Sequence, residues 1–250
     1  MSYQIKPYFS IVIFVLLVSI FSSCGEDASL NCMKNTGKVI SELREVNDFT
    51  EVVVERRIEV LLVPDNQNYV VITAGENLMS GIETTFENGK LTIQNKNKCN
   101  WLRSYKIPVK AEIHFKKLSR ITNYGTGTIK TLSPIVNDSL IIEFWNSASS
   151  AEIEVNNSFV STIQHVGPTD ITLTGKTDQF FVYGNDLAYL VADSLKADVA
   201  VVYWLSQKDV SVQANQFMLS EIESDGNVYW SGTGEVVKNI SKGKGRLIRK

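Results

Sequence analysis

Two stretches decide the fold: Gln179-Phe-Phe-Val-Tyr183 with Ala188-Tyr-Leu-Val-Ala192, and Asp198-Val-Ala-Val-Val-Tyr203 with Asp209-Val-Ser-Val-Gln213. Each is a pair of short runs rich in β-branched and aromatic residues, bounded by turn-forming residues, which is typical of β-strands. The pattern starts anew at intervals of 18 to 21 residues, at Ser139, Ser158, Gln179, Asp198 and Gln216. A period near 20 with two strands per unit predicts a solenoid, whose stacked units share one core.

An antiparallel β-sandwich is the alternative, because it also contains regularly spaced short strands. The sequence before the repeats alternates between apolar and polar residues. A brief helix is expected at Val39–Val46, and no stretch of ten or more residues has helical spacing. Asn88-Gly89 predicts a hairpin turn, and Pro64-Asp65-Asn66 a turn between strands at 57–63 and 69–73. The chain is therefore predicted to be all-β. Bends are expected at Asn146, Asn156, Gly167, Gly175, Gly184, Asp193 and Asn215.

The N-terminus predicts a secretory leader. Lys6 precedes an apolar run, and Ser22-Ser23 stand directly before Cys24. The apolar run from Phe9 to Phe21 is shorter than the roughly 20 residues that a membrane-spanning helix needs. This order resembles a bacterial lipoprotein signal, which implies that the Cys24 thiol receives a diacylglycerol and that the new N-terminus is acylated, for example with palmitate. A plain cleavage site beside an unmodified cysteine is the alternative.

These features divide the chain into three parts. We expect residues 1–23 to be a lipoprotein signal peptide, 24–43 a tether and 44–250 a single domain. More than one acyl chain holds a protein on a membrane stably, so the expected location is the outer membrane, on its periplasmic or its exposed side. The acidic pair Glu26-Asp27 suits either a surface-export signal or a solvated tether.

Composition narrows the function. Without its leader the chain has 24 basic and 27 acidic residues, because only Lys6 is lost, and this excess of acid argues against a nucleic-acid binder. Cys32 and Cys99 remain, and outside the cytoplasm such a pair predicts a disulfide; two free thiols are the alternative. No metal site and no cofactor are predicted, since there is no C-x-x-C and the two histidines lie far apart in the sequence.

Several segments together resemble the DUF2807 family, the head GIN domain of auto-transporter adhesins. Phe49-Thr-Glu-Val-Val-Val54 is similar to its opening strand, and Asn88-Gly-Lys-Leu-Thr-Ile93 to its next block. Gly226-Asn-Val-Tyr-Trp230-Ser-Gly-Thr-Gly234 and Gly243-Lys-Gly245 are similar to its closing pattern, although Trp230-Ser231 departs from it. The resemblance spans about residues 44–249. It implies a right-handed parallel β-helix, an adhesive role and no catalytic residues to transfer.

Motifs for catalysis are weak. Gly125-Thr-Gly127 lacks the following helix that a phosphate loop needs, and no Gly-x-Ser-x-Gly is present. Glu143, Glu152 and Glu154 alternate with apolar residues, as solvent-facing positions of strands do, although β-helices also carry paired carboxylates in glycan-cleaving enzymes. The aspartates at the bends suit turns.

Aromatic residues are the better candidates for binding. Trp145, Tyr203, Trp204 and Trp230 lie in the repeated half, where some are out of phase with the core. Exposed rings of this kind stack on sugars and mark contact sites; packing inside the solenoid is the alternative. A basic run near the C-terminus could meet anionic lipids or glycans, or protect the last strand edge; it comprises Lys238, Lys242, Lys244, Arg246, Arg249 and Lys250.

The resulting hypothesis is a lipid-anchored, non-enzymatic envelope protein. Its β-solenoid, on the order of 50 Å long, would present a surface for adhesion, with a glycan or another envelope protein as partner. Two alternatives stay open: a polysaccharide lyase or hydrolase on the same scaffold, and a structural or stress-response component that binds another envelope protein.

Overall fold

The computed structural model describes residues 35–97, 108–146 and 148–250, and β-strands make up most of them. The predicted leader, the lipidation site Cys24 and both Cys32 and Cys99 lie outside these residues. The strands are β1 (Val39–Glu45), β2 (Glu51–Glu55), β3 (Glu59–Pro64), β4 (Tyr69–Gly75), β5 (Ile82–Glu87), β6 (Lys90–Asn95), β7 (Lys110–Phe115), β8 (Arg120–Asn123), β9 (Thr128–Thr131), β10 (Ile135–Phe144), β11 (Ser149–Gln164), β12 (Thr169–Asp186), β13 (Tyr189–Ser206), β14 (Val210–Gln213), β15 (Phe217–Ile222), β16 (Val228–Ser231), β17 (Glu235–Ser241) and β18 (Leu247–Arg249). A single turn of helix, α3 (Glu76–Met79), interrupts them, and no helix of the described residues is long and apolar enough to cross a membrane.

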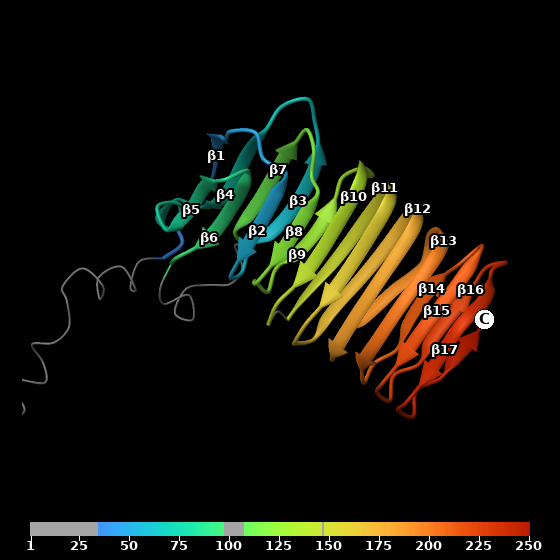
Figure 1. Ribbon diagram of the computed structural model, residues 1–250. Helices are drawn as coiled ribbons and strands as arrows, with labels where there is room; N and C mark the ends of the chain where they lie inside the picture. The colour runs from blue at the N-terminus through green and yellow to red at the C-terminus, as the bar shows by residue number, and fades with distance from the viewer. Residues whose placement is uncertain (1–34, 98–107, 147) are drawn as a thin grey trace, which may run out of the picture.

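The strands stack into two parallel ladders that enclose one core (Figure 1). Sheet I runs in the order β6-β2-β8-β10-β11-β12-β13-β15-β17, and sheet II in the order β7-β3-β9-β11-β12-β13-β14-β16-β18. The long strands β11, β12 and β13 bend from sheet II into sheet I, so they belong to both. Parallel coils of this kind confirm the predicted β-solenoid and exclude the antiparallel sandwich.

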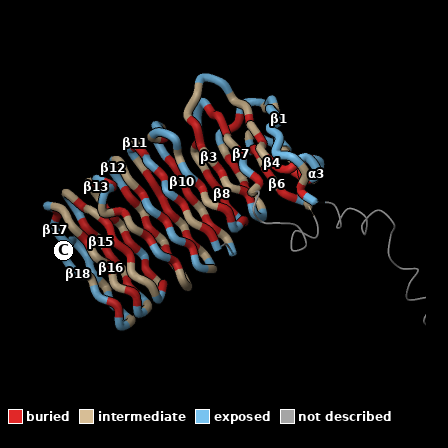
Figure 2. Tube along the Cα trace, turned by 180° about the vertical axis from the view of Figure 1, so that it is seen from behind, coloured by how far each residue is buried: buried red, intermediate tan, exposed pale blue. Residues whose placement is uncertain are grey.

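The rung length confirms the predicted period. Phe159 pairs with Gln179, Gln179 with Val199, and Val199 with Phe217, so equivalent positions are 18 or 20 residues apart. Along each rung buried and exposed residues alternate (Figure 2), because successive side chains of a strand point to opposite faces. The inward positions stack into apolar columns that run the length of the solenoid.

Some of the residues expected at bends adopt a positive φ, and one of them has another role. Asn146 and Gly167 have positive φ values of 47° and 102° in the turns between the sheets, as expected there. Gly184 differs from the prediction, because it lies within β12 and has no positive φ. A Cβ on Gly184 would lie 2.1 Å from Cζ3 of Trp204 on the next rung. Its small size therefore makes room for a buried indole rather than a bend.

The N-terminal end departs from a simple coil. The rung of β2 and β3 is flanked by β6 and β7 on one side and by β8 and β9 on the other. The chain therefore builds the terminal rung, β6 and β7, before it crosses β2 and β3 and continues the solenoid with β8. The antiparallel strands β4 and β5 extend the two sheets at this end. Asn88 and Gly89, with φ values of 51° and 76°, form the predicted hairpin turn between β5 and β6.

The helix expected at Val39–Val46 is wrong, because Val39–Glu45 forms strand β1. An isolated helix this short is unstable, whereas the edge of β4 offers a full row of backbone hydrogen bonds. Arg44 fixes the strand further. Its Nη1 donates to the carbonyl of Ile82 at 2.6 Å and to Oγ1 of Thr84 at 2.8 Å, which ties β1 to β5.

Candidate binding surfaces

The outer surface of sheet I is apolar over several neighbouring rungs. Outward positions of β10, β11, β12, β13 and β15 form what we call the apolar face, made of Ile141, Phe159, Ile163, Phe181, Tyr183, Val199, Val201, Tyr203, Phe217 and Leu219. Tyr203 and Phe217 are 40% and 41% exposed, and the others are half-buried by their neighbours. Two uncharged polar residues, Ser161 and Gln179, stand at outward positions among them. An exposed patch that is mostly apolar over this extent usually marks an interaction site.

The four predicted binding aromatics separate into two groups. Trp145 and Tyr203 lie on the outside, at the rim and within the apolar face. Trp204 and Trp230 are 0% and 4% exposed, so for these two the alternative applies, in which the rings pack inside the solenoid. Tyr203 and Trp204 are adjacent in one strand, so they must point to opposite faces, and the indole takes the inner side, where its Nε1 donates to the carbonyl of Lys208 at 2.7 Å.

A charged and aromatic cluster borders the apolar face at β10. The rings of Trp145 and His165 stack with centroids 3.4 Å apart, and Tyr183 lies 6.1 Å from His165. Nε2 of His165 is 3.0 Å from one Glu143 oxygen, and Nη1 of Arg120 donates to the other at 3.0 Å. This rim cluster combines flat rings with hydrogen-bonding groups, a combination that suits recognition of polar ligands that carry apolar faces.

Another charged group borders the face beyond β15. Nζ of Lys242 contacts both Glu221 and Glu223 at 2.5 Å. The ammonium lowers the pKa of the Glu221 carboxyl below its ordinary value, and the two carboxylates raise the pKa of Lys242. Charges of both signs therefore stand at this edge of the apolar face.

Sheet II presents a polar outer surface. Lys130 pairs with Glu152 of the neighbouring rung at 2.8 Å, and Lys208 reaches over Tyr189 to pair with Asp170, two rungs away, at 3.5 Å. Glu152 and Glu154 lie on this sheet, whereas Glu143 belongs to sheet I. Glu143 therefore lies on a different face from Glu152 and Glu154, and the three carboxylates considered for catalysis do not meet in one cleft.

A hollow of about 400 Å³ opens on sheet II near the N-terminal end, lined by Glu59, Val60, Leu61, Val71, Thr73, Lys110, Ala111, Glu112, Thr128 and Lys130. It holds two carboxylates and basic residues that the sequence did not suggest. Each is paired within the protein: Glu59 with Lys110 at 3.8 Å and Glu112 with His114 at 2.7 Å. In the described residues no cluster of metal-ligating side chains is found.

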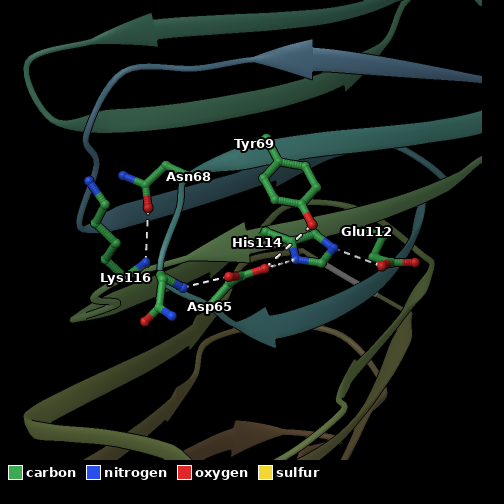
Figure 3. A network of polar contacts seen from close by, with 7 residues as sticks. Asp65, Asn68, Tyr69, Glu112, His114 and Lys116 are labelled. Atoms are coloured by element: carbon green, nitrogen blue, oxygen red, sulfur yellow. Dashed lines mark hydrogen bonds and ion pairs between the residues drawn. The ribbon is translucent and has the colours of Figure 1, made fainter.

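His114 is the centre of a polar network beside the hollow (Figure 3). Its Nδ1 is 2.7 Å from Oδ2 of Asp65, its Nε2 is 2.7 Å from Oε1 of Glu112, and the Tyr69 ring stacks on it at 3.9 Å. Each ring nitrogen therefore faces a carboxylate oxygen that can accept a hydrogen bond. His114 lowers the pKa of the Asp65 carboxyl, and partial burial raises the pKa of the Tyr69 phenol. The network fastens the β3–β4 turn to β7.

The glycine motif Gly125-Thr-Gly127 is structural. A Cβ on Gly125 would lie 1.8 Å from the carbonyl oxygen of Arg56, and one on Gly127 would lie 1.7 Å from that of Ile58. The glycines therefore allow the backbones of adjacent rungs to approach closely, and no helix follows them. This agrees with the prediction that they are turn glycines rather than a phosphate loop.

Solved structures with a similar fold include putative adhesins and a putative lipid binding protein. A putative adhesin from Bacteroides fragilis has a TM-score of 0.78 at 16% identity, covering 87% of this chain and 100% of that chain. A putative adhesin from Parabacteroides merdae has a TM-score of 0.65 at 16% identity, covering 87% and 98%. A putative lipid binding protein from Parabacteroides distasonis has a TM-score of 0.60 at 17% identity, covering 87% and 100%. At these identities the likeness establishes the fold alone.

No curated protein matches the sequence. One family model does match, that of DUF2807, "Putative auto-transporter adhesin, head GIN domain", over residues 48–234. This range contains all but the last rung and the first strand. The chain therefore belongs to the DUF2807 family of head GIN domains.

Proposed function

We propose that this protein is a lipid-anchored adhesion protein of the cell envelope, whose solenoid binds a macromolecular partner without catalysis. The apolar face carries the proposal, because a parallel sheet with apolar residues on both surfaces normally has both surfaces covered. Family membership supports an adhesive role, and the predicted leader directly before Cys24 supports attachment to the outer membrane.

Lipid attachment can be tested directly. In cells fed a labelled fatty acid, the wild-type chain is expected to incorporate label and to sediment with membranes. The C24S variant should incorporate none. Labelling of C24S equal to wild type would contradict the assignment of Cys24.

Adhesion can be tested with a matched pair of variants on one strand. Val201 lies on the apolar face, and Val191 is also half-buried but lies on the outer surface of sheet II. Cells that display V201K should adhere less than cells that display the wild type, and V191K should behave as wild type. Equal adhesion by all three chains would contradict the assignment of this face.

A glycan is a second candidate partner, favoured by the rim cluster. The stacked rings of Trp145 and His165, beside the Arg120–Glu143 pair, offer a flat platform and hydrogen-bonding groups together. A glycan array probed with residues 24–250 should then show binding that W145A loses. Binding of a second envelope protein would instead depend on Val201 and be insensitive to W145A.

Glycan cleavage is the rival from another class, and the hollow on sheet II is where it would occur. Among its charged side chains, Glu59 pairs with Lys110, Glu112 with His114 and Lys130 with Glu152. These pairings suit a structural role. We expect no lyase or hydrolase activity on uronic polymers. Activity abolished by E112Q would overturn the non-catalytic assignment.

A further inference from the structure

We infer that the apolar face binds the same face of a second copy of this chain, so that two solenoids pack sheet against sheet. The inference rests on the proposed function, since it names the partner of the surface assigned there.

The composition of the face calls for an apolar partner. Phe181, Val199, Val201 and Leu219 carry no charge and no hydrogen-bonding group, and the two polar residues at outward positions beside them, Ser161 and Gln179, are uncharged. In β13 the run Val199–Leu205 is apolar at every position, so both surfaces of the sheet are apolar there. The inner surface is covered by the core, while among the described residues nothing covers the outer one.

The shape of the face fits another sheet. From β10 to β15 the sheet I ladder is parallel and has no register break. Such a regular surface can pack against a second one at about 10 Å, as the two layers of a β-sandwich do. A two-fold axis makes one self-complementary patch sufficient for both partners.

The charge distribution selects this face over the other sheet. Charged groups of both signs stand only at its rims, where Glu143 pairs with Arg120, and Lys242 with Glu221. Two copies can therefore meet without burying an unpaired charge. The outer surface of sheet II carries Lys130, Glu152 and Asp170, among others, and would have to desolvate charges to do the same.

The size of the face predicts a weak complex. Five neighbouring strands span about 19 Å and three outward positions per strand span about 13 Å. With side chains at the margins this buries about 500 Å² per copy, or about 1,000 Å² in total, at the low end for specific complexes. We expect a dissociation constant in the micromolar range in solution. Attachment of both copies to membranes raises their effective concentration and favours the contact.

The experiment is analytical ultracentrifugation of the mature chain, residues 24–250 with C24S, from about 1 to 200 μM. The wild type should show a concentration-dependent dimer. V201K and F217K should weaken dimerisation at least tenfold, while V191K, on the same strand but on sheet II, should match the wild type. Phe217 is 41% exposed, so its replacement leaves the core intact, and thermal melts verify the fold of each variant.

Each outcome is decisive. A wild type that stays monomeric throughout, or equal dimerisation by V201K and V191K, overturns the inference. If the wild type is monomeric and V201K still loses adhesion, the proposed binding surface stands and its partner is another molecule. If V201K changes neither self-association nor adhesion, both proposals fail.

Discussion

Replacing Gly184 with alanine should destabilise the solenoid through a single steric conflict. The added Cβ would lie 2.1, 2.6 and 2.7 Å from three carbon atoms of the Trp204 ring. That ring is fully buried and its Nε1 is held by the carbonyl of Lys208 at 2.7 Å. It therefore has no free direction in which to move by the ångström or more that a normal contact requires.

The expected cost is roughly 2–3 kcal/mol, in the upper part of the range for overpacked cores, because the ring is rigid. For a domain of this size that corresponds to a fall in Tm of about 4–12 °C. Urea unfolding followed by both circular dichroism and tryptophan fluorescence measures the change and checks that the rungs unfold together.

A double-mutant cycle isolates the cause. W204L is itself destabilising, but it removes the ring atoms that the new methyl group at position 184 would meet, so G184A should cost less than about 1 kcal/mol in that background. The reasoning is refuted if G184A is as stable as the wild type. It is equally refuted if G184A lowers the free energy of unfolding by the same amount in the wild type and in W204L. Glycine would then be required there for its backbone conformation and not for the space it leaves to the indole.

Three further predictions concern the polar contacts. H114F should lower Tm by several degrees, because Asp65 and Glu112 lose their shared donor; an unchanged urea midpoint would make the network dispensable. In the folded protein the pKa values of Asp65 and Glu221 lie below their ordinary values of 3.8 and 4.5. Both ionised carboxylates therefore stabilise the fold fully above pH 3.8 and 4.5, and this stabilisation is lost as the pH falls through their lowered pKa values. In D65N and in E221Q the free energy of unfolding should therefore fall less steeply at acidic pH than in the wild type. Curves at acidic pH that coincide with the wild type would contradict this. R44M should speed hydrogen exchange in β1 while leaving β12 protected, and uniform acceleration would mean that β1 is not a separate unit.

Much of the fold could be predicted because its signals are local. The recurrence of paired apolar runs every 18 to 21 residues fixes the rung length, and Asn88-Gly89 fixes one hairpin. Each depends on neighbours in the chain. The helix expected at Val39–Val46 failed for the opposite reason, since the edge of β4, about 30 residues away, supplied the hydrogen bonds that decided its structure.

The binding surface was predicted only in part. Alternation says that Tyr203 and Trp204 point to opposite faces, but the run around them is apolar on both sides, so the pattern does not tell which is inside. Gly184 gives the answer only once the register places it beside Trp204. The His114 network was missed because Asp65 lies 49 residues from His114 and reaches it only through the pairing of β3 and β4 with β7, although Glu112 is a neighbour on the same strand.

The sequence by itself determined that this chain is a coil of short strands, because period and alternation are properties of consecutive residues. The tertiary structure alone decided which side of each strand became the core, which face was left apolar, and that β6 and β7 stack outside β2 and β3. Those outcomes depend on contacts between rungs, where the shape of one side chain against its neighbour on the next coil sets the free energy, and no single stretch of sequence contains both partners.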